Sequence, residues 1–91
     1  MRYIPVHTNI LVKLVEETKE GIVSAEQSDI IKGHVTEIGE GQRIDGKLTP
    51  MLVRPDSFVW FNRNSAIEIP ESIGKNLFVL SQDDIILIEE D

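Results

Sequence analysis

The two histidines, His7 and His34, are the residues that most directly suggest metal binding or proton transfer. A metal site needs several ligands in tight geometry, and neither histidine has a second ligand at helical or Cys-x-x-Cys spacing. Asp83 and Asp84 are adjacent carboxylates, but neighbours on a turn seldom face one another, so capping or turn formation is the better interpretation. The sequence therefore predicts no metal site and no cofactor.

Motifs for covalent or phosphate chemistry are also missing from the sequence. No serine lies in a Gly-x-Ser-x-Gly elbow, and no Ser/His/Asp arrangement follows from the spacing. Residues 39–41 (Gly-Glu-Gly) form a two-glycine turn without the further glycines or the lysine of a phosphate-binding loop. Phe58, Trp60 and Phe61 could stack rings, but we expect them to serve core or interface packing. We predict no catalytic residue, and a binding or assembly protein rather than an enzyme.

The overall composition limits the partners that the chain can have. Its 91 residues suit one domain, 1–91, and the absence of cysteine fits a reducing compartment. A net charge of −7 opposes nucleic-acid binding, which depends on Lys and Arg contacts to phosphates. The apolar runs are too short to span a membrane, and the N-terminus lacks a signal-peptide core. We expect a cytoplasmic protein with neither a nucleic-acid nor a membrane partner.

The apolar pattern along the chain is that of a small all-β protein. Residues 10–15 are β-branched and apolar on both faces, which predicts a well-buried strand, and residues 34–38 alternate with period two. Further strands are expected at residues 57–61, 66–69, 77–80 and 85–88, and a short extended piece between Pro50 and Pro55. Such short, closely spaced strands are typical of a small β-barrel or sandwich.

Two turns can be predicted in more detail. Asp45-Gly46 stands between short strand-like flanks, and this pair favours a type I′ hairpin because both central residues need positive φ. A single helical turn is expected near residues 81–84, since Ser and Asp favour N-caps. Both turns would connect strands without interrupting the barrel.

The sequence pattern of residues 16–33 (EETKEGIVSAEQSDIIKG) does not predict a particular secondary structure. The β-branched pair Ile22-Val23 sits within a polar run, without the alternation that usually flanks a strand. One interpretation is a short buried strand of the barrel; the other is a solvated loop whose apolar pair meets a partner. For Ile30-Ile31, the start of the next buried strand is the better interpretation.

The order of these elements along nearly the whole chain resembles the GroES-type co-chaperonins, the small lids of chaperonin rings. Residues 4–13 (IPVHTNILVK) are similar to the family's R-P-L-x-D-R-V-x-V-K, and residues 17–23 (ETKEGIV) to its E-x-x-T-x-x-G-G-I-V-L. Residues 33–41 (GHVTEIGEG) resemble G-x-V-x-A-V-G-x-G. Residues 53–61 (VRPDSFVWF) parallel V-K-x-G-D-x-V-x-F, and residues 77–88 the closing Y-L-I-L and D-I-L-A-I.

This resemblance implies an irregular GroES-like β-barrel that works as a ring of seven copies on a GroEL-type chaperonin. It also implies a mobile loop at about residues 18–32, whose chaperonin-binding residues are Gly21, Ile22, Val23 and Ser24. The loop would enter the groove that holds unfolded substrate, displacing it into the closed cavity. ATP would be bound by the partner and not by this chain.

The resemblance also implies where copies of the chain would meet. In the family, the N-terminal strand of one subunit pairs with the C-terminal strand of its neighbour, which here assigns Tyr3, Ile4, Ile86, Leu87 and Ile88 to the interface. The Asp45-Gly46 pair followed by Pro50 resembles N-G-x-x-x-P-L, the roof hairpin. That hairpin covers about residues 42–50, with Ile44, Asp45, Gly46 and Lys47 at its tip.

Two departures from the family pattern carry physical content. Ser24 stands where the family usually has a third apolar residue, so part of the anchor is missing, and Ile30-Ile31 or a shorter loop could compensate. Asp56 stands where the family prefers Gly, and Asp tolerates the left-handed region better than most residues. Such drift suits a divergent or phage-encoded member.

The main alternative to a co-chaperonin is a small OB- or SH3-like barrel that binds RNA or peptide. A basic face and clustered exposed aromatics would favour it, and the acidic composition does not.

Overall fold

The computed structural model describes residues 3–15 and 29–89, and this part of the chain is all-β. Its strands are β1 (Asn9–Leu14), β2 (Ile30–Ile38), β3 (Gln42–Ile44), β4 (Lys47–Thr49), β5 (Phe58–Asn62), β6 (Ile67–Glu68), β7 (Leu77–Ser81) and β8 (Ile85–Glu89). Two single-turn 3₁₀ helices, η2 (Arg63–Ser65) and η3 (Gln82–Asp84), connect strands. Within the described residues, no helix has the length and apolar character needed to cross a membrane.

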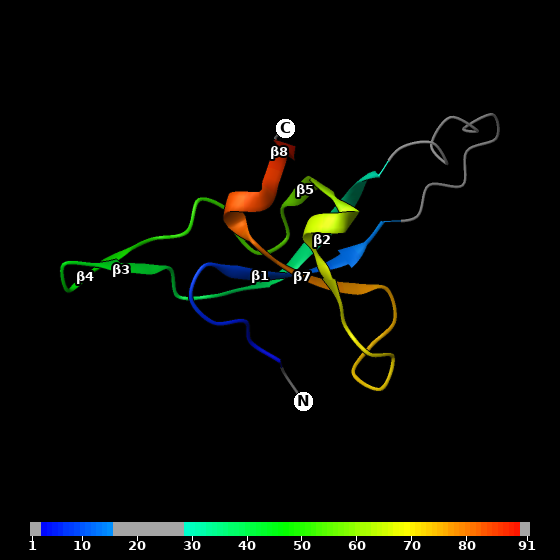
Figure 1. Ribbon diagram of the computed structural model, residues 1–91, viewed down its shortest axis with the longest axis horizontal. Coiled ribbons are helices and arrows are strands. Elements are labelled where there is room, and N and C mark those ends of the chain that lie inside the picture. The colour runs from blue at the N-terminus through cyan, green and yellow to red at the C-terminus, as the bar shows by residue number, and fades with distance from the viewer. Residues whose placement is uncertain (1–2, 16–28, 90–91) are drawn as a thin grey trace.

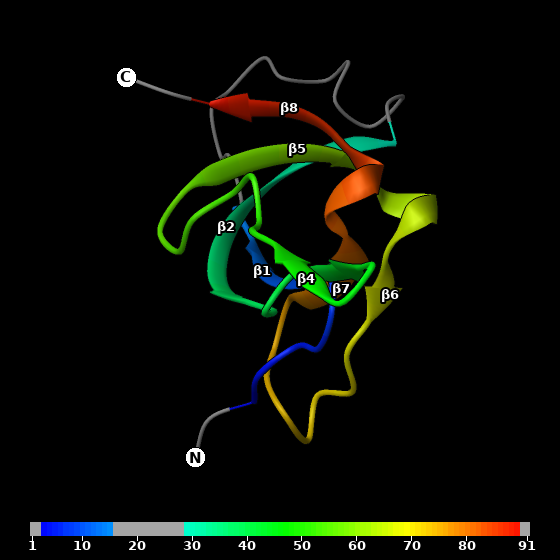
Figure 2. The ribbon, with the colours of Figure 1, turned by 90° about the vertical axis from the view of Figure 1, so that its left-hand side faces the viewer.

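Six of the strands form one antiparallel sheet in the order β6-β7-β1-β2-β5-β8, and β3 and β4 form a separate hairpin. Figure 2 shows this sheet curling around a central space as a small barrel, with the hairpin in front of it. The described strands leave β6 and β8 at the two ends of the sheet, so the barrel is not closed by a strand pair between them. The predicted all-β barrel is confirmed.

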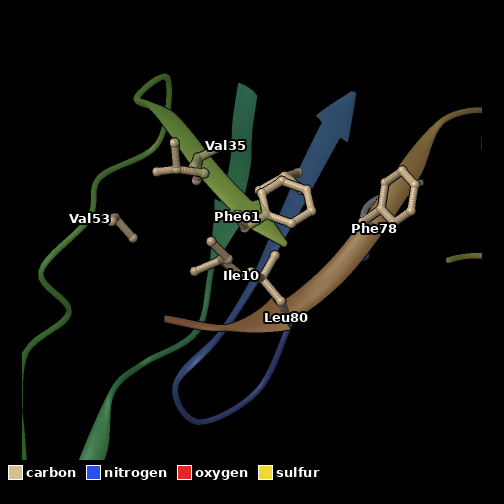
Figure 3. Close-up of a cluster of buried hydrophobic side chains, with 8 residues drawn as sticks. Ile10, Val35, Val53, Phe61, Phe78 and Leu80 are labelled. Atoms are coloured by element: carbon tan, nitrogen blue, oxygen red, sulfur yellow. The ribbon is translucent and has the colours of Figure 1, made fainter. Parts of the chain in front are cut away.

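The barrel interior is filled by aliphatic and aromatic side chains from β1, β2, β5 and β7 and from one loop (Figure 3). The buried residues are Ile10, Val12, Val35, Val53, Val59, Phe61, Phe78 and Leu80. The rings of Phe61 and Phe78 lie 6.0 Å apart and are tilted by 60°, within the range that aromatic pairs favour. Burying each of these side chains stabilises the fold by about 1.5–3 kcal/mol before the entropy cost of folding is counted.

Gly33 shows how tightly β2 is packed over this core. A Cβ atom at that position would lie 2.9 Å from Cε1 of Phe61 and 3.1 Å from Cβ of Val12. Both neighbours belong to the buried cluster and cannot retreat into solvent. Gly33 therefore allows β2 to continue past the Phe61 ring without a break.

The predicted hairpin and helical turn are both present. Asp45 and Gly46 connect β3 to β4 with φ values of 52° and 77°, the positive values that a type I′ turn requires. Figure 1 shows this hairpin extending away from the barrel. At η3, the hydroxyl of Ser81 accepts a hydrogen bond from the backbone N–H of Asp83 at 3.2 Å, as expected for an N-cap.

Asp56 has a φ of 73°, so an aspartate adopts the left-handed conformation here. Its backbone N–H donates to the carbonyl of Val35 at 2.7 Å. The turn before β5 is thus fixed to β2.

The structure differs from the sequence prediction in three places. The alternating run predicted at residues 34–38 is the second part of a longer strand, β2, which begins at the expected Ile30-Ile31 and continues without a break because its first part pairs with β5. The strand predicted at residues 66–69 contains only Ile67–Glu68. The piece between Pro50 and Pro55 joins no strand; instead Val53, only 2% exposed, fills part of the core from a loop.

Candidate functional site

The predicted binding residues Gly21, Ile22, Val23 and Ser24 lie outside the described residues, but the two ends of their segment are well defined. Val15 donates its backbone N–H to the carbonyl of Lys32 at 2.9 Å. On the other side, the carbonyl of Asp29 accepts from the backbone N–H of Arg63 at 2.7 Å. The described residues on either side of this segment are therefore both hydrogen-bonded to the barrel.

The last part of the predicted loop, residues 30–32, belongs to β2 and pairs with β5. Ile31 packs against the core, whereas Ile30 is 37% exposed at the start of the strand. This is the strand interpretation given for Ile30-Ile31 from the sequence. Because Ile31 is committed to the core, it is a poor substitute for the apolar anchor missing at Ser24.

Strand β8 carries the predicted interface residues Ile86, Leu87 and Ile88. Their exposed fractions are 51%, 59% and 38%, which is high for three consecutive aliphatic residues. They line an apolar groove of about 280 Å³ together with Leu52 and Val53. Among the described strands β8 pairs with β5 alone, so its outer edge and this groove remain open to a partner.

The other predicted interface residues, Tyr3 and Ile4, lie in an exposed N-terminal segment that forms no strand within the subunit. They are 43% and 58% exposed and border a second apolar groove of about 110 Å³. The rest of that groove is formed by Pro5, Leu11, Ile69, Ile73 and Val79. Figures 1 and 2 show the N-terminal segment on the opposite side of the barrel from β8, so the two apolar surfaces face away from each other.

The β3–β4 hairpin presents Ile44 and Leu48 to solvent, 51% and 47% exposed. A polar cleft of about 400 Å³ lies at its base, lined by His7, Thr8, Glu40, Gln42, Arg43 and Asp83. Within it, Nδ1 of His7 lies 3.5 Å from Oε2 of Glu40, and the backbone N–H of His7 donates to Oε1 at 3.1 Å. Hydrogen bonds from the backbone N–H groups of Glu40 itself and of His7 lower the pKa of the Glu40 carboxyl.

His7 and His34 are not brought together as metal ligands. Nε2 of His34 lies 3.2 Å from Oδ1 of Asp56, and its ring lies 5.0 Å from that of Phe58. Across residues 3–15 and 29–89, no three His, Asp or Glu side chains are grouped as metal ligands.

Sequence reasoning missed a cluster on the outer face of the sheet. Nζ of Lys32 lies 3.0 Å from Oε1 of Glu89, and it sits 4.9 Å and 5.7 Å from the ring centroids of Phe58 and Trp60. Hydrogen bonding from Lys32, supported by its charge and by Trp60, lowers the pKa of the Glu89 carboxyl. The alternation of Phe58 and Trp60 with buried residues could have indicated that these rings face outward, but not that Glu89 would reach them.

Comparison with known proteins gives one consistent family. Residues 2–88 match the family model described as the chaperonin 10 kDa subunit. A protein named co-chaperonin GroES from Hydrogenovibrio crunogenus is 38% identical, with 94% of this chain and 96% of that protein aligned. Proteins of the same name from Desulfosudis oleivorans and Aquifex aeolicus are 35% and 31% identical, covering 99% and 100% of this chain and 100% and 80% of their own lengths.

Proposed function

The chain belongs to the chaperonin 10 kDa subunit family, and from this premise we propose that it closes an ATP-driven, GroEL-type chaperonin as a ring-shaped lid of seven copies. The observation that carries the proposal is the family match over almost the whole chain, joined to a barrel with open apolar surfaces on two opposite sides. The lid would act in the cytoplasm without catalytic residues or cofactors of its own. ATP would be bound and hydrolysed by the partner.

The contact with the chaperonin would be made by the segment between Val15 and Asp29. Ile22 and Val23 are its apolar anchor, with Gly21 before them and Ser24 in a weakened third position. Burying Ile and Val side chains contributes about 1.5–3 kcal/mol each, and ordering a loop on binding offsets much of that. A weak contact of this kind would be reversible, as a lid that must open and close requires.

Seven weak contacts can still hold a lid in place, because copies fixed in one ring bind at a high effective concentration. The two anchored ends of the segment support this arrangement, since they set the position from which each loop leaves the barrel. Entry of the anchor into the groove that holds unfolded substrate would displace the substrate into the cavity.

The ring itself would form by contact between the N-terminal segment of one copy and β8 of the next. A contact between two different surfaces of the same chain generates a ring when the rotation closes. The open edge of β8 and the N-terminal segment on the opposite side supply two such surfaces, with Tyr3 and Ile4 on one and Ile86, Leu87 and Ile88 on the other. The β3–β4 hairpin, with Asp45 and Gly46 at its tip and Ile44 and Lys47 beside them, would form the roof over the cavity.

The decisive experiment is co-elution of the chain with a GroEL-type chaperonin in the presence and absence of ATP. We expect nucleotide-dependent co-elution of the unaltered chain and its loss in Val23→Asp, because a charge would have to enter an apolar groove. Ser28→Asp adds the same charge within the same segment, and we expect it to bind. Ser24→Leu should bind more tightly than the unaltered chain.

Retention of Val23→Asp on the chaperonin would contradict the assignment of the anchor. Sedimentation tests the ring separately: we expect a species of about 70 kDa, seven times the 10.3 kDa of one chain. A chain that stays monomeric at micromolar concentrations would contradict the lid and favour a binding module that acts alone.

A further inference from the structure

The side chain of Lys32, on β2, reaches across β5 to β8, the next strand of the sheet. In the sheet register, Lys32 is opposite Trp60 and Trp60 is opposite Leu87, whereas Glu89 is opposite Phe58. The lysine side chain therefore crosses β5 diagonally before its ammonium meets the Glu89 carboxylate at 3.0 Å. The aromatic rings beneath it hold the cation in place, since both centroids lie within the distance at which a cation attracts a ring face.

The environment of the pair makes it more than a chance surface contact. The Lys32 side chain is 17% exposed, so its stem and most of its charge are covered by neighbours. Glu89 is 44% exposed and lies at the last described position of β8. A partly covered lysine whose position is set by two rings loses little further freedom on pairing, unlike two long side chains that meet in open solvent.

Among residues 3–15 and 29–89, few other contacts hold the outer half of β8. Ile85 packs against the core, but the four residues after it are exposed. Backbone pairing with β5 is interrupted by a register shift opposite Trp60 and Phe61. An edge strand with few buried contacts is expected to open locally.

We propose that Lys32 is a positioning residue, whose contact with Glu89 fixes the outer half of β8 in the geometry that a second copy of the chain must meet. The role in assembly rests on the proposed function, whereas the fixing of β8 is a property of the single subunit. Lys32 lies three residues after Asp29, and its carbonyl accepts the backbone N–H of Val15 at the other end of the segment proposed to bind the chaperonin. The same residue therefore connects the base of that segment to β8.

The first test is amide hydrogen exchange in β8, which measures local opening of the strand in any oligomeric state. Lys32→Met keeps the apolar stem over the rings and removes the charge. We expect exchange at the amides of Leu87, Ile88 and Glu89 to become roughly two- to fivefold faster, the range for one lost ion pair at a partly exposed site. Lys32→Arg should restore the slow rate, and Lys13→Met, which removes a lysine from neighbouring β1, should leave β8 unchanged.

A double-mutant cycle with Glu89→Gln shows whether the effect acts through this pair. If it does, Lys32→Met combined with Glu89→Gln will exchange no faster than either single variant. Trp60 is the only tryptophan of the chain, so its fluorescence should report loss of the lysine in both backgrounds. Additive effects of the two substitutions, or a β8 exchange rate that Lys32→Met does not change, would overturn the proposal.

The second test is self-association, followed by sedimentation over a concentration series without chaperonin. Lys32→Met and Glu89→Gln should raise the midpoint concentration of assembly roughly two- to fivefold, with recovery in Lys32→Arg. Assembly of Lys32→Met at the same concentration as the unaltered chain, with β8 exchange accelerated, would overturn the role in assembly. Failure of the unaltered chain to associate would instead refute the ring, and β8 exchange would still decide whether Lys32 fixes the strand.

Discussion

β7 and β8 are both five-residue, largely apolar strands, but β7 buries apolar side chains in the core and β8 leaves most of its own exposed. β7 (LFVLS) pairs with β1 on one side and β6 on the other, and it buries Phe78 and Leu80. β8 (IILIE) pairs only with β5 among the described strands, and leaves Ile86, Leu87 and Ile88 exposed. The hydrophobicity of a strand therefore does not determine its burial; its place in the sheet does.

This difference separates apolar side chains that stabilise the folded chain from apolar side chains that are available for the proposed contact between copies. Apolar side chains in β7 are covered within the subunit, so they stabilise it at any concentration. Those of β8 are left uncovered by the described residues, and an exposed apolar strand edge is unfavourable unless something pairs with it. We therefore expect substitutions in β7 to act on folding and substitutions in β8 to act on association.

The largest effect is expected in β7. Phe78→Ala would leave a cavity beside Phe61 and should lower the free energy of unfolding by about 3–5 kcal/mol. Leu87→Ala, in exposed β8, should lower the free energy of unfolding of the single chain by less than about 1 kcal/mol. Urea unfolding of both variants measures this contrast, and equal losses would show that β8 belongs to the folding core.

The second effect concerns self-association. Ile86→Asp places a charge in the apolar groove beside β8, so we expect the midpoint concentration of assembly to rise by about tenfold or more while the subunit stays folded. Asn76→Asp adds the same charge at an exposed turn before β7 and should assemble normally. Sedimentation distinguishes the two variants. If Ile86→Asp assembled with the same midpoint concentration as the unaltered chain, β8 would be excluded as the interface.

The smallest effect should appear as a dependence on pH. The pKa of the Glu89 carboxyl is lowered from the usual 4.5 when the chain is folded, which means that the ionised carboxylate stabilises the fold. This stabilisation is complete above pH 4.5 and is lost as the pH falls through the pKa of the folded state. Lys32 faces this carboxylate, with His34 and Asp56 beyond Phe58 on the same surface. The protection factors of the β8 amides, which correct for the slower intrinsic exchange at low pH, should therefore fall more on acidification than those of the β7 amides, and Glu89→Gln should reduce this difference.

Much of the barrel could be predicted because its signals are local. The Asp45-Gly46 turn follows from the backbone freedom of those two residues, and the Ser81 cap from the reach of one hydroxyl to a nearby N–H. Strand positions followed from alternation and β-branched residues. A strand start at Ile30-Ile31 was expected from the sequence, but its continuation without a break into residues 34–38 depends on pairing with β5 across a long stretch of sequence, which no local pattern shows.

The candidate site was predictable to a smaller degree. Resemblance pointed to the apolar residues of β8, and the structure adds that they are exposed beside a groove. No pattern could place Lys32 beside Glu89, since their contact depends on the register of three strands.

The sequence by itself determined the all-β composition of the chain, its turns and its family, because these depend on residue types and on their order. The tertiary structure alone decided which apolar strand is core and which is surface. It also decided that a lysine next to the proposed binding segment meets the C-terminal strand. Both outcomes depend on strand order and register, which arise from contacts between distant residues and are not encoded in any short stretch of the chain.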